Sequence, residues 1–216
     1  MTSARSCIVV FGREPLPGRA KTRLSVGIGD AAAARVGQVL LQQTLTAALA
    51  TRLPVTLALA DEPTAALALP AGIELAIQPE GDLGQRMAAA FREAFDAGHD
   101  RVVLVGTDIP GLRAEHLLAA RGRLTAVPVV LGPARDGGYY LVAQRAPGLD
   151  LFTEIPWSSP DTLMATRRRI EAHGAFHREI EPLGDVDTEA DLRAALGDPD
   201  LPDALCDALR AALEGT

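Results

Sequence analysis

The sequence predicts a single α/β domain, a three-layer α/β/α sandwich with a mixed, mainly parallel sheet. Segments typical of strands alternate with segments typical of helices along the chain. The 216 residues are 48% hydrophobic and 23% charged, which is sufficient for one large core but leaves two domains cramped. We therefore expect residues 1–216 to form one domain.

Six strands are expected from short apolar runs: residues 7–11, 55–60, 74–78, 101–106, 128–131 and 139–143. Six helices are expected from longer segments: residues 30–50, with Asp30 placed to cap them, 83–97, 113–124, 161–173, 188–196 and 202–213. The turn PARDGG indicates an antiparallel pair between the last two strands, so the sheet is mixed.

Ligands bind at the carboxyl ends of the strands in such sheets. The loops that start at Gly12, Pro79, Thr107 and Pro133 are therefore expected to converge on one site.

Charge and cysteine content restrict the partners. The formal net charge of −7 argues against duplex DNA or an anionic membrane surface, because either requires a broad basic face. Two cysteines give neither a disulfide framework nor a CxxC metal site. No run approaches the roughly 20 apolar residues that span a bilayer, and the N-terminus lacks an apolar leader. We expect a cytoplasmic protein that binds small molecules and no nucleic acid.

The loop FGREPLPGRAKTRL after the first strand predicts a phosphate-binding edge. Prolines stiffen it, and the glycines Gly12 and Gly18 let the backbone approach a ligand closely. Its positive charge comes from Arg13, Arg19, Lys21 and Arg23. A small polyanion is the expected ligand.

The loop PEGDLGQRM has two interpretations of equal weight. Asp82 is placed to cap a helix that begins at Leu83, in which case the loop is only a helix start. Alternatively, Gly81, Gly84 and Arg86 present backbone amides and a guanidinium to a nucleobase or ribose.

Asp108 predicts a metal ligand. It follows the apolar run VVLVG at the end of a buried strand, where a carboxylate adds little stability but suits Mg²⁺ or Mn²⁺ shared with substrate phosphates. The alternative is that Asp108 or Thr107 only caps the next helix. The sequence favours the metal-ligand interpretation, because a cationic loop at one strand end and a carboxylate at the neighbouring strand end together suit a metal and a diphosphate.

The segment PARDGGYY is expected to form part of an acceptor or sugar site. The residues concerned are Arg135, Asp136, Gly137, Gly138 and Tyr139, with Asp136 as an orienting group or general base. The alternative is an ordinary hairpin turn.

Two later segments also allow more than one interpretation. Trp157, the only tryptophan, is favoured as a packed indole over an aromatic lid on the acceptor. Asp185 and Asp187 precede a helix that Thr188 is placed to cap. One of these carboxylates either serves that helix start or returns to Asp108 as a second metal ligand.

The segments FGREPLPGRAKTRL, GDLGQRM, GTDIPGL, LGPARDGGYYLV, IPWSSP and GDVDTEADL occur in an order that resembles a bacterial family. This family consists of glycosyltransferase-A-like proteins labelled radical-SAM/selenodomain-associated or arsenosugar-biosynthesis glycosyltransferases. The resemblance implies a nucleotide-diphospho-sugar transferase fold with a mixed seven-stranded sheet. It also implies that Lys21 and Arg23 meet phosphates, that the loop from Gly81 to Arg86 holds the base, and that Asp108 binds the divalent metal.

The same segments are similar to phospholactate guanylyltransferases and molybdenum-cofactor nucleotidyltransferases. Sugar transferases of this fold usually carry Asp-x-Asp at the metal, whereas Pro110 stands at the third position here. The nucleotidyltransferases usually begin with a richer glycine loop, whereas Glu14, Pro15 and Pro17 interrupt this one. Each departure weakens one of the two assignments.

We expect a metal-dependent transferase, with Lys21, Asp108 and Asp136 as catalytic residues and Asp108 and Asp187 as metal ligands. The main expectation is transfer of a sugar from an NDP-sugar to a small acceptor. The first alternative is transfer of an NMP group from an NTP to a small phosphorylated or hydroxylated metabolite, with release of pyrophosphate. A second alternative is a nucleotide-binding protein without catalysis.

Overall fold

The computed structural model describes residues 5–215, which form a seven-stranded sheet in the order β3-β2-β1-β4-β6-β5-β7. The strands are β1 (Ser6–Gly12), β2 (Val55–Leu59), β3 (Ile73–Ile77), β4 (Arg101–Gly106), β5 (Val129–Pro133), β6 (Tyr139–Arg145) and β7 (His177–Glu179). Strand β6 is antiparallel to β4 and β5, whereas the other pairs are parallel. The expected mixed, mainly parallel sheet is confirmed.

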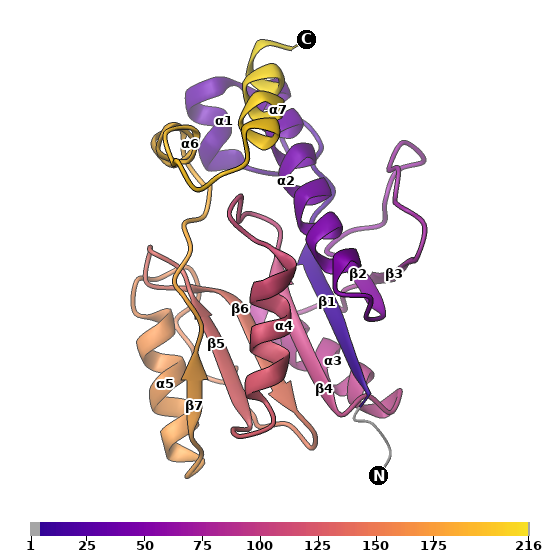
Figure 1. The fold of residues 1–216 in the computed structure, drawn as a ribbon, viewed down its shortest axis with the longest axis vertical. Coiled ribbons are helices and arrows are strands. Elements are labelled where there is room, and N and C mark those ends of the chain that lie inside the picture. The colour runs from indigo at the N-terminus through magenta and orange to yellow at the C-terminus, as the bar shows by residue number, and fades with distance from the viewer. Residues whose placement is uncertain (1–4, 216) are drawn as a thin grey trace.

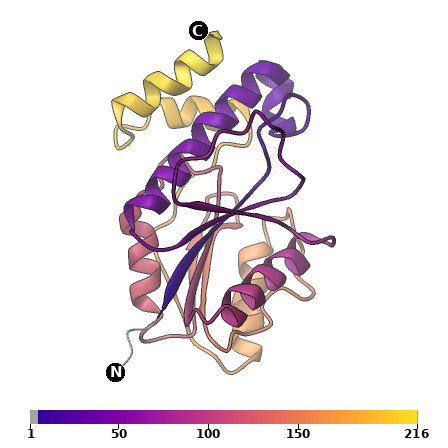
Figure 2. The ribbon, with the colours of Figure 1, turned by 90° about the vertical axis from the view of Figure 1, so that its right-hand side faces the viewer.

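Helices cover both faces of this sheet. They are α1 (Thr22–Ile28), α2 (Asp30–Ala50), α3 (Leu83–Asp96), α4 (Ala114–Arg123), α5 (Thr162–Ala172), α6 (Glu189–Leu196) and α7 (Asp203–Glu214). Helices α2 and α4 lie on one face, and α3 and α5 lie on the other (Figure 2). None of the helices within residues 5–215 combines the length and apolar character needed to cross a membrane.

Alternation along β1 divides the apolar core between the two faces. Ile8 and Val10 belong to the cluster beneath α2 and α4, whereas Cys7 and Val9 belong to the cluster beneath α3 and α5. Successive strand residues point to opposite faces, so one buried strand supplies both cores. Both clusters stabilise the strand whose end carries the cationic loop.

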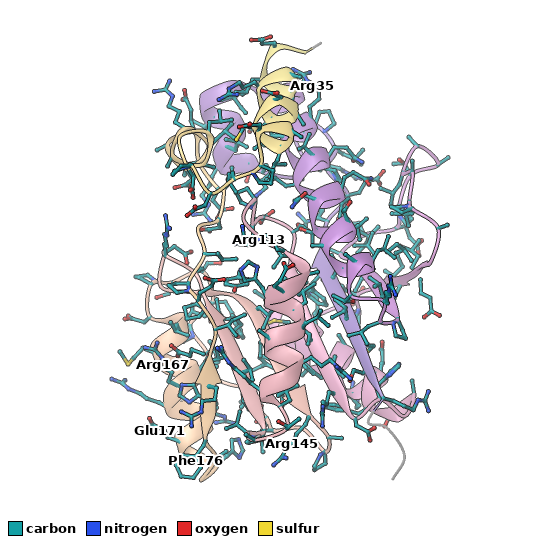
Figure 3. All side chains as sticks on the ribbon, in the orientation of Figure 1. Arg35, Arg113, Arg145, Arg167, Glu171 and Phe176 are labelled. Atoms are coloured by element: carbon teal, nitrogen blue, oxygen red, sulfur yellow. The ribbon has the colours of Figure 1, made fainter. Side chains whose placement is uncertain are left out.

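A third apolar cluster joins α1, α2, α6 and α7 at one end of the molecule (Figure 1). The carboxyl ends of β1 and β4 face this end (Figure 1). Arg35 of α2 adds a polar contact, because its Nε donates to the carbonyl oxygen of Ala212 at 2.7 Å (Figure 3). The segment after β7 must therefore pass the strand ends before it enters α6.

Three sequence expectations about the elements are corrected. Helix α1 and strand β7 were not predicted, because each is short and carries polar or helix-weakening residues. Asp30 is the first residue of α2 and not its cap, since Gly29 occupies the N-cap position and no side-chain cap bond forms there. The other strands and helices agree with expectation within two residues at each end.

Candidate active site

Two cavities meet at Asp108. The first, which we call the cationic cavity, has a volume of about 340 Å³ and is lined by Arg13, Arg19 and Lys21 of the loop after β1. The second, which we call the aromatic cavity, has a volume of about 300 Å³ and includes Tyr139 and Trp157 in its lining. Phe11, Gly106 and Asp108 line both cavities. Groups bound in the two cavities would therefore meet at the carboxyl ends of β1 and β4.

Lys21 connects the loop after β1 to the loop after β4. Its Nζ lies 2.6 Å from Oδ1 of Asp108 and 3.6 Å from Oδ1 of Asp187. It also donates to the carbonyl oxygen of Val186 at 2.6 Å. Only 7% of this side chain is exposed, so a cation is held between two carboxylates at the junction of the cavities.

The backbone at Lys21 is strained. Lys21 is the N-cap of α1 and has φ of 55°, in the left-handed region. Such a conformation costs about 1–3 kcal/mol in a residue that is not glycine and is concentrated at functional sites. The sequence places the only lysine of the chain at this position.

Asp187 faces Lys21 and does not cap α6. Thr188 caps α6 by accepting from the Asp191 amide, and Asp191 accepts from the Thr188 amide in return. The carboxylate of Asp187 pairs with Arg23 as well as with Lys21. Of the two interpretations weighed for this segment, the contacts of Asp187 match the one that returns it to Asp108.

Asp108 likewise does not cap the following helix, α4. The N-cap position of α4 belongs to Arg113. Oδ1 of Asp108 accepts from Lys21 and, at 3.3 Å, from the hydroxyl of Thr107. The backbone oxygen of Asp108 accepts from the Val186 amide at 2.9 Å, which fixes the segment carrying Asp187 beside the end of β4.

The carboxylates of Asp108 and Asp187 suit a hard divalent cation. Both approach the same ammonium, so they already surround a position of positive charge. Within residues 5–215, no group of three or more His, Cys, Asp or Glu side chains forms a complete metal site. Two carboxylates are sufficient for Mg²⁺ or Mn²⁺ when substrate phosphates and water supply the remaining ligands.

The cationic loop is fixed by Glu14, which the sequence analysis did not single out as functional. Glu14 is buried, and its carboxylate accepts from the amide of Thr64 at 2.8 Å and from its hydroxyl at 2.6 Å. Arg13 forms an ion pair with Asp61 at 3.2 Å in the same neighbouring segment. The loop is therefore tied to the chain that follows β2, while its other cations face the cavity.

Two glycines of the cationic loop allow backbone arrangements that a side chain would hinder. A Cβ at Gly12 would lie 2.8 Å from the Thr107 methyl group, so the ends of β1 and β4 pack together only without a side chain there. Gly18 has φ of 71° and allows the loop to turn back.

The loop before α3 does not reach either cavity through its expected residues. Asp82 and Gln85 form a reciprocal capping box, and Arg86 donates to Oε1 of Gln78 at 3.0 Å. Leu83 and Met87 line the aromatic cavity. Neither cavity is lined by the residues expected to bind a nucleotide, which are Gly81, Asp82, Gly84 and Arg86. These contacts match the helix-start interpretation of the loop.

Gly84 is required for packing. A Cβ there would lie 2.7 Å from the carbonyl oxygen of Phe152 and 2.9 Å from the indole of Trp157. The Trp157 ring contacts Phe152 and, edge to face, Tyr139, with centroids 6.3 and 6.4 Å apart. Trp157 is thus a packed indole, as favoured, and it also forms a wall of the aromatic cavity.

The turn after β5 combines both interpretations given to it. Oδ1 of Asp136 accepts from the Gly138 amide at 2.8 Å, which closes the turn. Gly137 has φ of 93°, and a Cβ there would collide with the backbone of Pro160. Asp136, Gly138 and Tyr139 nevertheless line the aromatic cavity. Arg135 lines a neighbouring cavity of about 300 Å³ instead.

The aromatic cavity is rich in carboxylates. Asp108, Asp136, Asp185 and Asp187 all line it, and Arg23 lines it as well. Burial raises the pKa of Asp185 above its usual value, and the charge of Asp136 raises that pKa further. Convergence of the loops that carry Asp108 and Asp136 was expected, whereas the presence of both Asp185 and Asp187 in one cavity was not.

The chain is similar to a bacterial protein family and to a curated guanylyltransferase. A family model described as an uncharacterized protein conserved in bacteria (DUF2064) matches residues 40–159. A phosphoenolpyruvate guanylyltransferase from Streptomyces scabiei is 33% identical over 192 residues, which cover 83% of this chain and 85% of that protein.

Two solved structures share the fold. A protein from Desulfovibrio desulfuricans G20, provisionally described as a nucleotide-diphospho-sugar transferase, is 30% identical with a TM-score of 0.88, covering 99% of this chain and 98% of that chain. Rv0371c from Mycobacterium tuberculosis H37Rv, solved as a complex with manganese, is 20% identical with a TM-score of 0.52. That match covers 91% of this chain and 100% of that chain and indicates the fold alone.

Proposed function

This chain belongs to the bacterial family DUF2064 and is a transferase, and from that premise we propose that it transfers an NMP group from an NTP to a small acceptor and releases pyrophosphate. One observation carries the proposal. A cationic cavity and an aromatic cavity meet at Asp108, where Lys21 and Asp187 also converge. A donor triphosphate and an acceptor bound on the two sides would place the reacting phosphorus at that junction.

The cationic cavity suits the triphosphate. Arg13, Arg19 and Lys21 bring three positive charges to one loop of a protein whose formal net charge is −7. Arginine offers paired donors to phosphate oxygens, and lysine offers a compact charge. Glu14 holds the loop in place through Thr64, so these donors are oriented before the nucleotide binds.

Asp108 and Asp187 would hold Mg²⁺ or Mn²⁺. When bound, the cation would neutralise negative charge on the donor phosphates. Lys21 and Arg23 contact the same carboxylates and are placed to donate to phosphate oxygens beside them. The manganese complex of Rv0371c, a protein of this fold, supports a cation of this class.

In the proposed reaction, an acceptor oxygen attacks the α-phosphorus and the bond to pyrophosphate breaks. Negative charge then grows on the leaving pyrophosphate. Lys21, Arg13 and Arg19 stabilise that charge, and a well-aimed donor of this kind contributes about 2.7–4 kcal/mol in other enzymes. Where the acceptor is a hydroxyl, Asp136 is placed in the aromatic cavity to accept its proton.

Nucleotidyl transfer is better supported than the glycosyl transfer that the sequence first favoured. The relative from Streptomyces scabiei is named as a guanylyltransferase. The third position of the motif that begins at Asp108 is Pro110, so the Asp-x-Asp metal motif usual in sugar transferases of this fold is incomplete. Glycosyl transfer stays the second candidate because the neighbour from Desulfovibrio desulfuricans is described as a nucleotide-diphospho-sugar transferase.

The two candidates differ in the donor they bind. Thermal unfolding with Mn²⁺ and a panel of NTPs and NDP-sugars distinguishes them, because a donor at 100 times its Kd adds about 2.7 kcal/mol to the free energy of unfolding. Stabilisation by an NTP, followed by transfer of label from its α-phosphorus to an acceptor, supports the proposal. Stabilisation by an NDP-sugar without any response to NTPs contradicts it.

A further inference from the structure

The charge of the aromatic cavity restricts the acceptor, and this inference rests on the proposed nucleotidyl transfer. We propose that the acceptor is a hydroxylated compound with a neutral or positively charged body and an apolar face, and that anions carrying phosphate or carboxylate groups are excluded. The Streptomyces scabiei relative is named for an anionic substrate, phosphoenolpyruvate. The proposal therefore separates this chain from that relative.

Two carboxylates of the cavity have no cationic partner. Asp108 and Asp187 are paired with Lys21 and Arg23. Asp136 and Asp185 also line the cavity, and neither forms an ion pair among residues 5–215. Arg23 also lines the cavity but pairs with Asp187, so an acceptor anion near Asp136 and Asp185 would face unpaired negative charge, whereas an ammonium group would be attracted.

The rest of the lining favours an apolar face on the acceptor. Leu83, Met87, Tyr139 and Trp157 contribute to the cavity. The Tyr139 and Trp157 rings are arranged edge to face, so the two rings lie at different angles in the lining. Aromatic faces bind apolar groups and also attract cations. At about 300 Å³, the cavity suits a molecule of roughly one ring with a short side chain.

A carboxylate in this position also favours a hydroxyl nucleophile. Phosphate and carboxylate oxygens are ionised at neutral pH and need no base, whereas a hydroxyl must lose its proton during attack. Oδ1 of Asp136 accepts from the Gly138 amide, so Oδ2 is the oxygen that would take up the proton. The hydroxyl oxygen would bond to the α-phosphorus, the bond to pyrophosphate would break, and the proton would pass to Asp136.

A series of isosteric probes tests the charge preference directly. Tyramine, tyrosol and para-hydroxyphenylacetate share a phenol ring and carry positive, zero and negative charge. Their dissociation constants are measured by calorimetry with Mn²⁺ and a non-hydrolysable NTP present, and phosphoenolpyruvate is the fourth probe. We expect tyramine and tyrosol to bind at least about tenfold more tightly than either anion. Tighter or equal binding of an anion, or binding of none of the four, overturns the proposal.

Two variants test whether the charge preference for the acceptor arises in the aromatic cavity. Asp136→Asn and Asp185→Asn should each reduce the ratio of anion to tyramine dissociation constants by about threefold or more. Asp96→Asn is the matched control, since Asp96 is an exposed carboxylate at the end of α3 and should leave the ratio unchanged. An unchanged ratio in both cavity variants overturns the assignment.

Nucleotide binding is measured on the same samples, so failure of the two proposals can be distinguished. A protein stabilised by NDP-sugars and not by NTPs contradicts nucleotidyl transfer even if the probe series shows the expected order. A protein stabilised by NTPs that prefers the anionic probes contradicts the acceptor proposal and leaves nucleotidyl transfer in place.

Discussion

The Nζ of Lys21 lies 2.6 Å from Oδ1 of Asp108, although the two residues follow different strands of the sheet. This pair joins the loop after β1 to the end of β4 at the point where the two cavities meet. The carboxylate holds the ammonium in place, and the ammonium offsets repulsion between Asp108 and Asp187. The site is therefore organised before a nucleotide or a divalent cation binds.

Replacing Lys21 by Met should reduce transfer by at least about a hundredfold, because a donor to the leaving pyrophosphate is lost. The same change leaves two neighbouring carboxylates without their shared cation, so the variant should also bind Mn²⁺ more tightly in the absence of nucleotide. Initial rates and Mn²⁺ titrations followed by electron paramagnetic resonance measure the two effects.

Arg210→Met is the control for this change, because among residues 5–215 the only ion pair of Arg210 is with Asp207 on the exposed face of α7. It should alter neither the rate nor Mn²⁺ binding. Full activity in the Lys21→Met variant would remove Lys21 from the proposed machinery.

Removing the carboxylate of Asp187 should weaken cation binding. Asp187→Asn keeps the size of the side chain and loses the charge that faces Lys21 and Arg23. We expect the Mn²⁺ affinity of the nucleotide complex to fall at least about tenfold and activity to recover partly at high Mn²⁺. Asp203→Asn, an exposed residue at the start of α7, is the matched control. If chelation of all divalent cations leaves transfer intact, the metal proposal fails.

Glu14 should control nucleotide affinity through the position of the cationic loop. Glu14→Gln weakens the contacts with the Thr64 amide and hydroxyl, and a hydrogen bond to a charged group contributes about 1.5–3 kcal/mol. We expect a higher KM for the NTP and a lower free energy of unfolding. Thr64→Val removes one of the same contacts. The two changes combined should cost less than the sum of the single changes, and full additivity would show that the pair does not act as a unit.

The sequence predicted the convergence of strand ends because that convergence follows from topology. A buried apolar run followed by Asp108 and another followed by a cationic loop place both groups at the same edge once the strands are parallel. The contact between Lys21 and Asp108 is one outcome of this arrangement. The exact partners were not predictable, since they depend on how the segment around Val186 returns across the strand ends.

Local patterns failed where tertiary contacts decide the structure. Strand β7 contains only His177–Glu179, and three polar residues carry no apolar alternation. The loop from Gly81 to Arg86 was ambiguous for a different reason. The residues that would present amides to a base are also those that form a capping box. The tertiary contacts that match a helix start are the bond from Arg86 to Gln78 and the packing of Trp157 against Gly84.

Gly84→Ala tests that packing. The new methyl group would lie 2.7 Å from the carbonyl oxygen of Phe152 and 2.9 Å from the Trp157 indole, so the indole or the backbone must shift. We expect a loss of about 1–3 kcal/mol in the free energy of unfolding and a change in tryptophan fluorescence. Gly122→Ala is the control, because nothing lies within 4 Å of a Cβ there. Equal stability of the two variants would contradict the close packing.

The ion pair between α5 and β7 should make stability depend on acid pH. Arg167 lies beside β7 (Figure 3), and its Nε and Nη2 donate to the two carboxylate oxygens of Glu179 at 2.7 and 2.9 Å. These bonds lower the pKa of Glu179 below its usual value of 4.5. The stabilisation is therefore present above about pH 4.5 and is lost as the pH falls through the lowered pKa.

Arg167→Met should consequently reduce the free energy of unfolding by about 1 kcal/mol at neutral pH, since both side chains are partly exposed. The difference between parent and variant should shrink as the pH falls below about 4.5, because the protonated Glu179 no longer gains from the guanidinium. Denaturant titrations over a pH series measure this difference. Because β7 begins the segment that carries Asp187 past the strand ends, we expect the variant also to bind Mn²⁺ less tightly. A difference in stability that stays constant with pH would contradict the role of the pair.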